Sequence, residues 1–134
     1  MRIFRWPVRV YIENTDAGGI VYYADYLCFL ERARTEWLRA AGIELGDIAR
    51  LHRSHFVVRS VNVQYRQPAR LNDELEVSVN MRSLKSASLQ LEQNVYRGTE
   101  CLVEGWVALA CVDVETGAPV RIPAELKEAI TGEC

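Results

Sequence analysis

Hydrophobic and polar residues alternate along the chain with two different periods. The segment 9–13, with Val10 and Ile12 between more polar neighbours, has the period-two pattern of a half-buried strand. From about 24 to 41, apolar residues recur at steps of three and four, which predicts a long helix with one wide apolar face. Gly42 follows where a left-handed residue often ends a helix. The chain therefore begins with a strand and a long amphipathic helix.

Most of the remaining chain has the pattern of strands. The segment 74–82 alternates cleanly and is bounded by turn residues, whereas 101–114 is apolar on both faces in its second half, as expected of a central strand. The predicted strands are 56–65, 74–82, 87–95 and 101–114, followed by a short helix at 123–130. Because the loops between these strands are short, the sheet is expected to be antiparallel.

One long helix and one antiparallel sheet bury their apolar faces when the sheet curls around the helix. The predicted fold class is therefore α+β, with about five strands around a central helix, in a single domain spanning residues 1–134. Such a sheet leaves an edge and an outer face uncovered, so we expect a homo-oligomer.

The loop before the long helix has a pattern that suggests chemistry. Asp16 is followed by Gly18 and Gly19 just before the helix begins. The first turn of a helix presents unpaired N–H groups that can hold a carbonyl oxygen as it becomes negative, and glycine lets a ligand approach the backbone. A carboxylate beside such donors can attack the carbonyl carbon or take a proton from water. The alternative is an ordinary turn aspartate, because Asp-x-Gly-Gly is also common in turns.

The segments 15–26 and 31–38 resemble the hotdog-fold acyl-CoA thioesterases, both the 4-hydroxybenzoyl-CoA thioesterases and the Tol-Pal-associated acyl-CoA thioesterases. The resemblance covers nearly the whole chain and implies a hotdog fold and thioester hydrolysis without a metal or redox cofactor. It implies that Asp16 is the nucleophile or general base and that the backbone N–H of Tyr23 polarises the thioester carbonyl. It also implies an active site between subunits, in dimers that often pair into tetramers.

This chain departs from the pattern at one position. Tol-Pal-associated members usually carry histidine where this chain has Tyr23, whereas the hydroxybenzoyl-CoA enzymes resemble it in having tyrosine. A mechanism that needs an imidazole at this position is therefore not favoured, and one that uses the backbone amide is unaffected.

Further candidate substrate contacts each have a plain alternative. Lys85-Ser86 resembles the family's basic turn near the coenzyme A (CoA) phosphates, or Lys85 is a solvated turn lysine. Arg59 interrupts an apolar strand face, as a substrate contact or as half of an ion pair between subunits. Gly18 and Gly19 are expected to lie against the substrate, and Tyr22 either shapes an acyl pocket or packs in the core.

Two residues on the helix leave the same kind of choice. Trp37 either shapes an acyl pocket or belongs to the core. Glu31 either lines the site or pairs with Arg34 or Thr35 along the helix.

Composition narrows the partners and the compartment. The 16 Lys+Arg and 18 Asp+Glu of the 134 residues give a net charge of −2, which argues against a nucleic-acid partner. No stretch approaches the roughly 18 apolar residues of a membrane span. The first seven residues include an arginine and a proline where a signal peptide needs an apolar core, so we expect a cytoplasmic protein. The 4 Cys and 2 His lack metal-ligand spacing, and the cysteines are expected to be small buried residues.

The sequence therefore predicts a homo-oligomeric thioesterase that hydrolyses a small or medium acyl-CoA and needs no cofactor. The alternative is a hotdog-fold scaffold that binds an acyl carrier protein or an envelope-complex component, with little turnover. An acyl carrier protein is also a possible partner of the enzyme.

Overall fold

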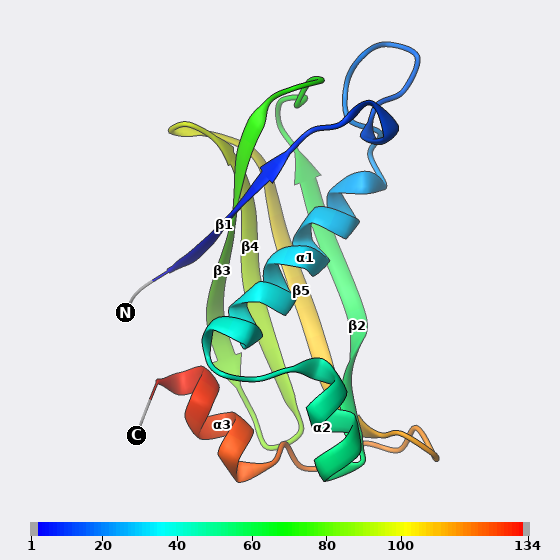
Figure 1. Ribbon diagram of the computed structural model, residues 1–134, viewed down its shortest axis with the longest axis vertical. Helices are drawn as coiled ribbons and strands as arrows, with labels where there is room; N and C mark the ends of the chain where they lie inside the picture. The colour runs from blue at the N-terminus through cyan, green and yellow to red at the C-terminus, as the bar shows by residue number, and fades with distance from the viewer. Residues whose placement is uncertain (1–2, 133–134) are drawn as a thin grey trace.

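The computed structural model describes residues 3–132 and has the predicted α+β architecture. Figure 1 shows one long helix lying across a face of the sheet, with the two shorter helices near the end where the long helix finishes. The elements are β1 (Phe4–Arg9), the 3-10 helix η1 (Ile12–Asn14), α1 (Asp25–Ala40), α2 (Leu45–His52), β2 (Ser54–Tyr65), β3 (Glu74–Leu84), β4 (Ser88–Arg97), β5 (Glu100–Asp113) and α3 (Ala124–Thr131).

The strands form a 5-stranded sheet in the order β1-β3-β4-β5-β2. Every neighbouring pair is antiparallel, which confirms the prediction made from the short loops. Because β2 pairs only with β5 and β1 only with β3, these two strands are the edges of the sheet.

The apolar face of α1 forms the centre of the core. Phe29, Leu30 and Ala33 are fully or almost fully buried, and α1 packs mainly against β1 and β3. Close packing depends on Gly105 of β5, since a Cβ there would lie 2.7 Å from the Gln93 carbonyl oxygen and 3.3 Å from Leu30 Cδ1. The buried Gln93 amide donates a 3.0 Å hydrogen bond to the Leu30 carbonyl, which ties the helix to the sheet.

The edge strand β2 is poorly covered. Val58, Val61 and Tyr65 pair with β5 residues that face α1, yet they are 47%, 39% and 47% exposed. The register between β2 and β5 shifts between Val58 and Ser60, so Arg59 is the extra residue of a β-bulge.

The first predicted strand, at 9–13, is displaced in the structure. The β1–β3 pairing ends at Arg9, opposite Glu74, and the chain then turns through the 3-10 helix η1. The Asn14 side chain closes this turn by accepting a 2.8 Å hydrogen bond from the Tyr11 amide. The alternation of apolar residues thus continued past the end of the strand into a turn.

The other elements agree with the predicted ones to within a few residues, and one element was missed. The helix α2 was not predicted; the short terminal helix and the four later strands were. Among residues 3–132, no helix combines the length and the apolar character that a membrane crossing requires.

Candidate active site

The loop that carries Asp16 is fixed by its own hydrogen bonds. One carboxylate oxygen of Asp16 accepts a 2.8 Å bond from the Gly18 amide, and its carbonyl accepts a 3.1 Å bond from the Gly19 amide. Gly19 has φ +77°, a left-handed conformation that favours glycine. Within residues 3–132 the second carboxylate oxygen has no hydrogen-bond partner, so it is free to act on a ligand.

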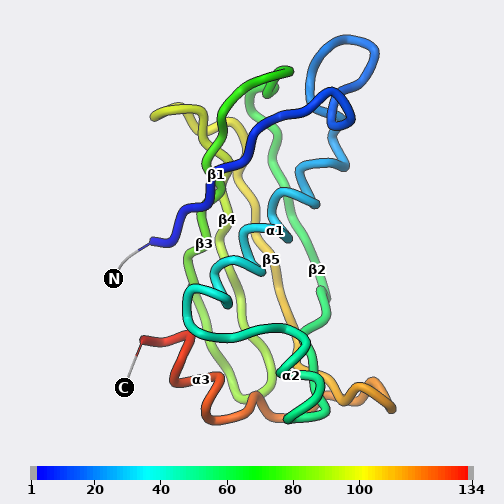
Figure 2. The backbone as a smooth tube through the Cα atoms, viewed as in Figure 1, coloured from blue at the N-terminus to red at the C-terminus, as the bar shows by residue number. Residues whose placement is uncertain are grey.

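The same loop is anchored to the start of α1. The side chain of Asn14, which is buried, donates a 2.9 Å hydrogen bond to Asp25, in the first turn of the helix. The Tyr22 amide donates a 2.8 Å bond to the Asn14 carbonyl. Figure 2 shows the loop projecting at the end of the molecule where α1 begins. Asp16 and the opening turn of α1 are therefore held at one end of the fold.

Tyr23 lies in the turn directly before Ala24, the N-cap residue of α1, and its amide is unused. No acceptor among residues 3–132 is bonded to the Tyr23 N–H, while the Tyr23 carbonyl accepts a 3.0 Å bond from the Tyr65 hydroxyl of β2. Unpaired amides at a helix start carry a partial positive charge and bind anionic oxygen. This amide is the donor that the sequence predicted for a carbonyl oxygen.

Aromatic rings surround this turn. Tyr22 and Tyr23 have ring centroids 4.9 Å apart and are 46% and 62% exposed. Hydrogen bonding with Tyr23 is the main cause that raises the pKa of Tyr22. Tyr26 is a core residue whose hydroxyl accepts a bond from the Ala69 amide, and burial raises its pKa. Tyr26 therefore belongs to the core, whereas the exposed ring of Tyr22 is accessible to a ligand.

Asp16 itself is exposed to solvent and borders none of the cavities described in this single chain. A carboxylate in water can still act as a base, but nothing in its own chain encloses a substrate beside it. In the described chain, Asp16 therefore lies on an open surface and not in one of these cavities.

The predicted phosphate contact Lys85 and the predicted substrate contact Arg59 lie at the same cavity. Arg59 and Lys85 line one cavity of about 390 Å³, with three serines that sequence reasoning missed: Ser60, Ser83 and Ser88. Ser86 does not line this cavity, and its carbonyl instead accepts a 2.8 Å bond from the Ile122 amide. Arg59 of β2 and Lys85 of the β3–β4 turn thus line the same cavity, a relation that spacing in the sequence does not reveal.

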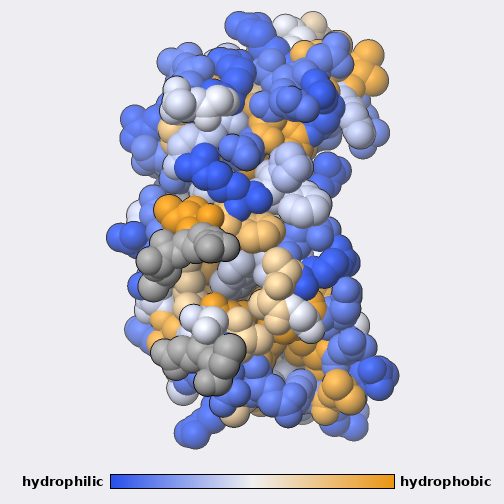
Figure 3. All heavy atoms as spheres, turned by 60° about the vertical axis from the view of Figure 1, so that its left-hand side comes forward, coloured by the Kyte–Doolittle hydropathy of each residue, from blue (hydrophilic) through white to orange (hydrophobic). Residues whose placement is uncertain are grey.

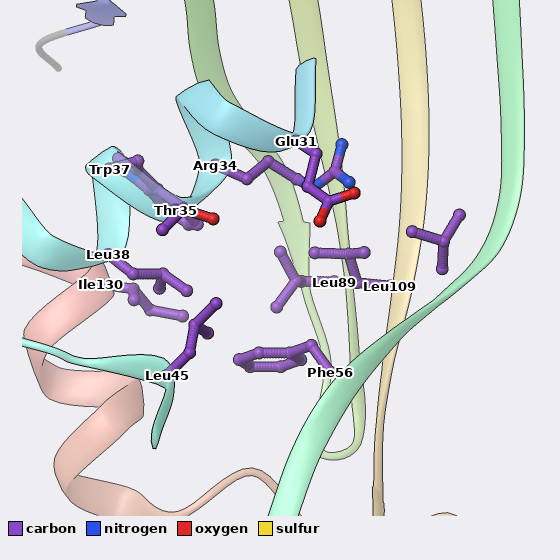
Figure 4. A pocket seen from close by; sticks show the side chains of 11 residues that line it. Glu31, Arg34, Thr35, Trp37, Leu38, Leu45, Phe56, Leu89, Leu109 and Ile130 are labelled. Atoms are coloured by element: carbon purple, nitrogen blue, oxygen red, sulfur yellow. The ribbon is translucent and has the colours of Figure 1, made fainter. Parts of the chain in front are cut away.

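The helix candidates gather at a different cavity. Glu31 and Trp37 line a space of about 180 Å³ beside the second half of α1, together with Arg34 (Figure 4). Burial lowers the pKa of the Arg34 guanidinium, which donates a 3.0 Å hydrogen bond to the Gln93 side chain. Glu31 therefore faces a cavity, and Trp37 lines it while also packing against the core.

The histidines and cysteines form no metal site in the described part of the chain. Residues 3–132 contain no group of three His, Cys, Asp or Glu side chains placed to bind a metal ion. Cys111 is buried as predicted, whereas Cys28 is exposed on α1, and Cys134 lies outside the described residues.

Known proteins resemble this chain over most of its length. The sequence profile of the Thioesterase-like superfamily matches residues 10–130. The acyl-CoA thioesterase YbgC of Haemophilus influenzae is 42% identical over 126 residues, which are 94% of this chain and 93% of the relative. The acyl-CoA thioester hydrolase YbgC of Escherichia coli is 42% identical over 125 residues, 92% of each chain.

A solved structure shares the fold. The crystal structure of a probable thioesterase from Bartonella henselae has a TM-score of 0.87 and 33% identity, covering 91% of this chain and 100% of that one. The predicted fold is therefore the fold of a solved relative.

Proposed function

The chain belongs to the thioesterase-like superfamily and is an acyl-CoA thioester hydrolase, and we propose that Asp16 is its catalytic carboxylate. Hydrolysis joins water to the acyl carbon and releases a carboxylic acid and the free thiol of CoA. The observation that supports the assignment is that Asp16 and the unpaired Tyr23 amide lie at the same end of α1, on a loop fixed through Asn14.

The two groups divide the chemistry between them. The Tyr23 amide donates to the thioester oxygen and stabilises the negative charge that develops there. The free oxygen of Asp16 either attacks the carbonyl carbon or takes a proton from an attacking water. The bond from the Gly18 amide orients the carboxylate in both cases, and Gly18 and Gly19 leave room for the substrate beside the backbone.

CoA binding is assigned to the cavity that Arg59 and Lys85 share. Two cations and several hydroxyls around one space of about 390 Å³ suit a phosphate group, which accepts charge-assisted hydrogen bonds. Ser86 stays a predicted contact through its place next to Lys85 in the turn.

A second copy of the chain is proposed to complete the active site. β2 is an edge strand with exposed apolar residues, and a strand of another chain can pair with it. The Asp16 loop is exposed, so a second surface is needed to enclose a substrate beside it. A dimer of this kind agrees with the predicted homo-oligomer. Tetramer formation, an acyl carrier protein partner, a cytoplasmic location and hydrolysis without a metal or redox cofactor stay predictions.

The alternative of a scaffold with little turnover is not favoured, because the curated relatives at 42% identity are named as thioester hydrolases. The same measurement separates the two functions. Free thiol released from a panel of acyl-CoA substrates measures turnover directly, and a scaffold would release little across the whole panel.

The test of Asp16 is the Asp16→Asn variant. Asparagine keeps a side-chain oxygen that accepts from the Gly18 amide, so the loop is expected to stay folded while kcat falls by at least about 100-fold. Glu13→Gln is the matched control, because it removes an exposed carboxylate from the same part of the chain and is expected to keep native kcat. Near-native turnover by the Asp16→Asn variant would exclude the assigned role.

A further inference from the structure

The face of the sheet that points away from α1 carries two adjoining cavities. One is the cavity of about 390 Å³ to which the CoA phosphates were assigned above. The other measures about 340 Å³ and is lined by Trp106 of β5 and Asn62 of β2, and we call it the Trp106 cavity. Both cavities are lined by Ser60, Gln90 and Ala108, which form one row across β2, β4 and β5. The two cavities are therefore parts of one groove.

The ring of Trp106 is accessible from this groove. Its neighbour Gly105 faces Leu30 of α1, so the alternation along β5 places Trp106 on the opposite face, where it is 41% exposed. The guanidinium of Arg82 lies over the ring at 6.0 Å from its centroid and pairs with Glu92 at 3.7 Å. Neither of these two charged residues lines the Trp106 cavity, so they leave it open. The ring thus offers a flat apolar surface to a ligand.

The side-chain amides beside Trp106 are not used by the fold. Within residues 3–132, the Gln90 amide has no hydrogen-bond partner. Asn62 accepts a 3.2 Å hydrogen bond from Gln64 through its oxygen, and its amide nitrogen has no acceptor among the same residues. Since both side chains line the Trp106 cavity, donors and an acceptor are available next to the ring.

The cations of the groove are also unpaired. Among the described strands, Arg59 is the arginine that has no carboxylate partner, and Lys85 in the following turn has none either. The other strand arginines each form an ion pair with a carboxylate; they are Arg5, Arg9, Arg82 and Arg97. An unpaired arginine and an unpaired lysine around one cavity leave two positive charges for an anionic ligand.

These groups together have the chemistry of a nucleotide site. Purine bases stack on aromatic rings, and the amides of asparagine and glutamine pair with the edge of adenine. Phosphates accept charge-assisted hydrogen bonds from cations. CoA ends in adenosine 3′,5′-bisphosphate, which joins an adenine base to phosphates through one ribose. The groove has a stacking surface and free amides in one cavity and free cations in the next, so it offers both kinds of contact.

We infer that the groove binds the nucleotide half of CoA, with the adenine stacked on Trp106 and the phosphates beside Arg59 and Lys85. This inference rests on the proposed function and deepens it, because it names what the enzyme recognises besides the thioester. Thioesters of pantetheine, and of the phosphopantetheine of carrier proteins, lack the adenine nucleotide. The groove therefore favours free CoA thioesters over both.

The kinetic test removes the ring and the nucleotide in turn. Trp106→Leu is expected to raise KM for an acyl-CoA by at least about fivefold and to keep kcat, because a stacked base loses its aromatic partner. Trp106→Phe keeps a ring and should restore most of the native KM. With the same acyl group on pantetheine, the wild type and Trp106→Leu should have equal kcat/KM. A merely structural role of Trp106 would lower kcat/KM for both substrates.

Tyr96→Leu is the matched control. Tyr96 lies on the same face of the sheet, and Arg5 lies over its ring at 4.4 Å, much as Arg82 lies over Trp106. It lines neither cavity of the groove. Tyr96→Leu is therefore expected to keep the native KM for both substrates.

A binding measurement is independent of turnover. The Asp16→Asn protein is titrated with adenosine 3′,5′-bisphosphate, and the indole N–H signals of its 3 tryptophans are followed by NMR. The Trp106 signal is expected to shift, while Trp37, which lines the cavity beside α1, is the internal reference. Inorganic phosphate has no base and should leave the Trp106 signal in place. AMP serves as the probe for a free nucleotide in the same groove.

The outcomes decide as follows. A KM for acyl-CoA that rises in Trp106→Leu alone, with a shifted Trp106 signal, supports the inference. An unchanged KM in Trp106→Leu overturns it, even if AMP shifts the Trp106 signal, because the groove then binds free nucleotides and not the substrate. Equal losses on the CoA and pantetheine substrates also overturn it.

Failure of the proposed function is seen separately. A wild type that hydrolyses no acyl-CoA overturns the proposed function, and the titration with adenosine 3′,5′-bisphosphate then decides on the groove. The same titration decides if Trp106→Leu does not fold, since it uses a protein with native Trp106. A Trp106 signal that the bisphosphate leaves in place overturns the inference in both cases.

Discussion

The two edges of the sheet are built differently. β1 has 6 residues, includes Pro7, and carries ion pairs of Arg5 with Glu76 (3.6 Å) and of Arg9 with Glu74 (2.8 Å). β2 has 12 residues and exposes Val58, Val61 and Tyr65 toward the side of α1. Short length, proline and charge keep a sheet edge from pairing with another chain, and β1 combines all three. β2 is long and has no proline, and its charged residue Arg59 lies on the bulge.

The side of the molecule toward β1 still exposes some apolar residues. Figure 3 shows hydrophilic residues over most of its two ends, with apolar residues gathered in the middle. The difference between the two edges supports the proposal that a second copy of the chain pairs with β2. The open edge also lies next to the proposed catalytic turn, since the Tyr65 hydroxyl of β2 donates a hydrogen bond to the Tyr23 carbonyl.

A lysine at the open edge should have the largest effect. Val61→Lys puts a charge on the edge strand where the second copy is proposed to pair, so the protein is expected to become monomeric. Without the second copy, the surface proposed to enclose the substrate beside Asp16 is lost, and kcat/KM should fall by about 100-fold. Sedimentation velocity gives the oligomeric state and thiol release gives the activity.

The matched control changes an exposed apolar residue beside the other edge. Ile3 is 46% exposed against 39% for Val61, so Ile3→Lys adds the same charge at a similar degree of exposure. It is expected to keep the native oligomer and native activity. Equal losses in both variants would show that the edges do not differ as described.

Away from both edges, the middle of the sheet should affect stability alone. In Gly105→Ala, the added Cβ meets the Gln93 carbonyl oxygen at 2.7 Å, so β4 and β5 must shift. The expected cost is about 1–3 kcal/mol of unfolding free energy, as for other overpacked cores. Urea unfolding measures it, and the oligomeric state of the folded fraction should be native.

Gly46→Ala is the control for that change. Gly46 lies in α2, and a Cβ added there would meet no neighbouring element of the described chain within 4 Å. Alanine at this position should raise the stability by roughly 0.5 kcal/mol, because it restricts the unfolded chain and favours the helix. A loss of stability in Gly46→Ala, or none in Gly105→Ala, would contradict the packing described for α1.

The sequence predicted the elements whose pattern is local and long. Alternation over 74–82 and the helical period over 24–41 are repeated enough to identify β3 and α1. The short helix α2 escaped because its 8 residues include Gly46 and have only Ile48 buried. The end of β1 was misplaced because Val10 and Ile12 continue the alternation, while the Asn14 side chain turns the backbone.

In the candidate site, too, the part that is continuous in sequence could be predicted, and the parts that only the fold brings together could not. The Asp16 loop is continuous in sequence, so its glycines and the helix start were visible together. The cavity beside the second half of α1 is assembled from six elements, to which Leu45, Phe56 and Ile130 belong, and no local pattern marks it. Arg59 and Lys85 were candidates for separate reasons, and only the folded chain shows that they line one cavity.

Opening the closed edge should have a smaller effect. In a double variant, Arg5→Val with Arg9→Val, the ion pairs with Glu76 and Glu74 are removed and the β1 edge becomes apolar. These pairs are exposed, so the unfolding free energy should change by less than about 1 kcal/mol. New concentration-dependent association in sedimentation is expected, with native activity at low concentration. Unchanged association would show that Pro7 and the short length suffice to close this edge.

The smallest expected effect is a change in the titration of one tyrosine beside the open edge. The pKa of Tyr22 is raised mainly through hydrogen bonding with Tyr23, so Tyr23→Phe should lower the pKa of Tyr22 toward its usual value of about 10. A pKa raised by folding means that this contribution to stability is present below the unfolded pKa and is lost as the pH rises through the folded pKa. Tyr23→Phe should therefore weaken the fall in stability at alkaline pH, and ring NMR signals followed against pH give the pKa of Tyr22. Tyr26, whose pKa is raised mainly by burial, should titrate as before and is the control. If the pKa of Tyr22 stays raised in Tyr23→Phe but falls in the Val61→Lys monomer, cover by the second copy sets it, and the open edge reaches as far as the proposed site.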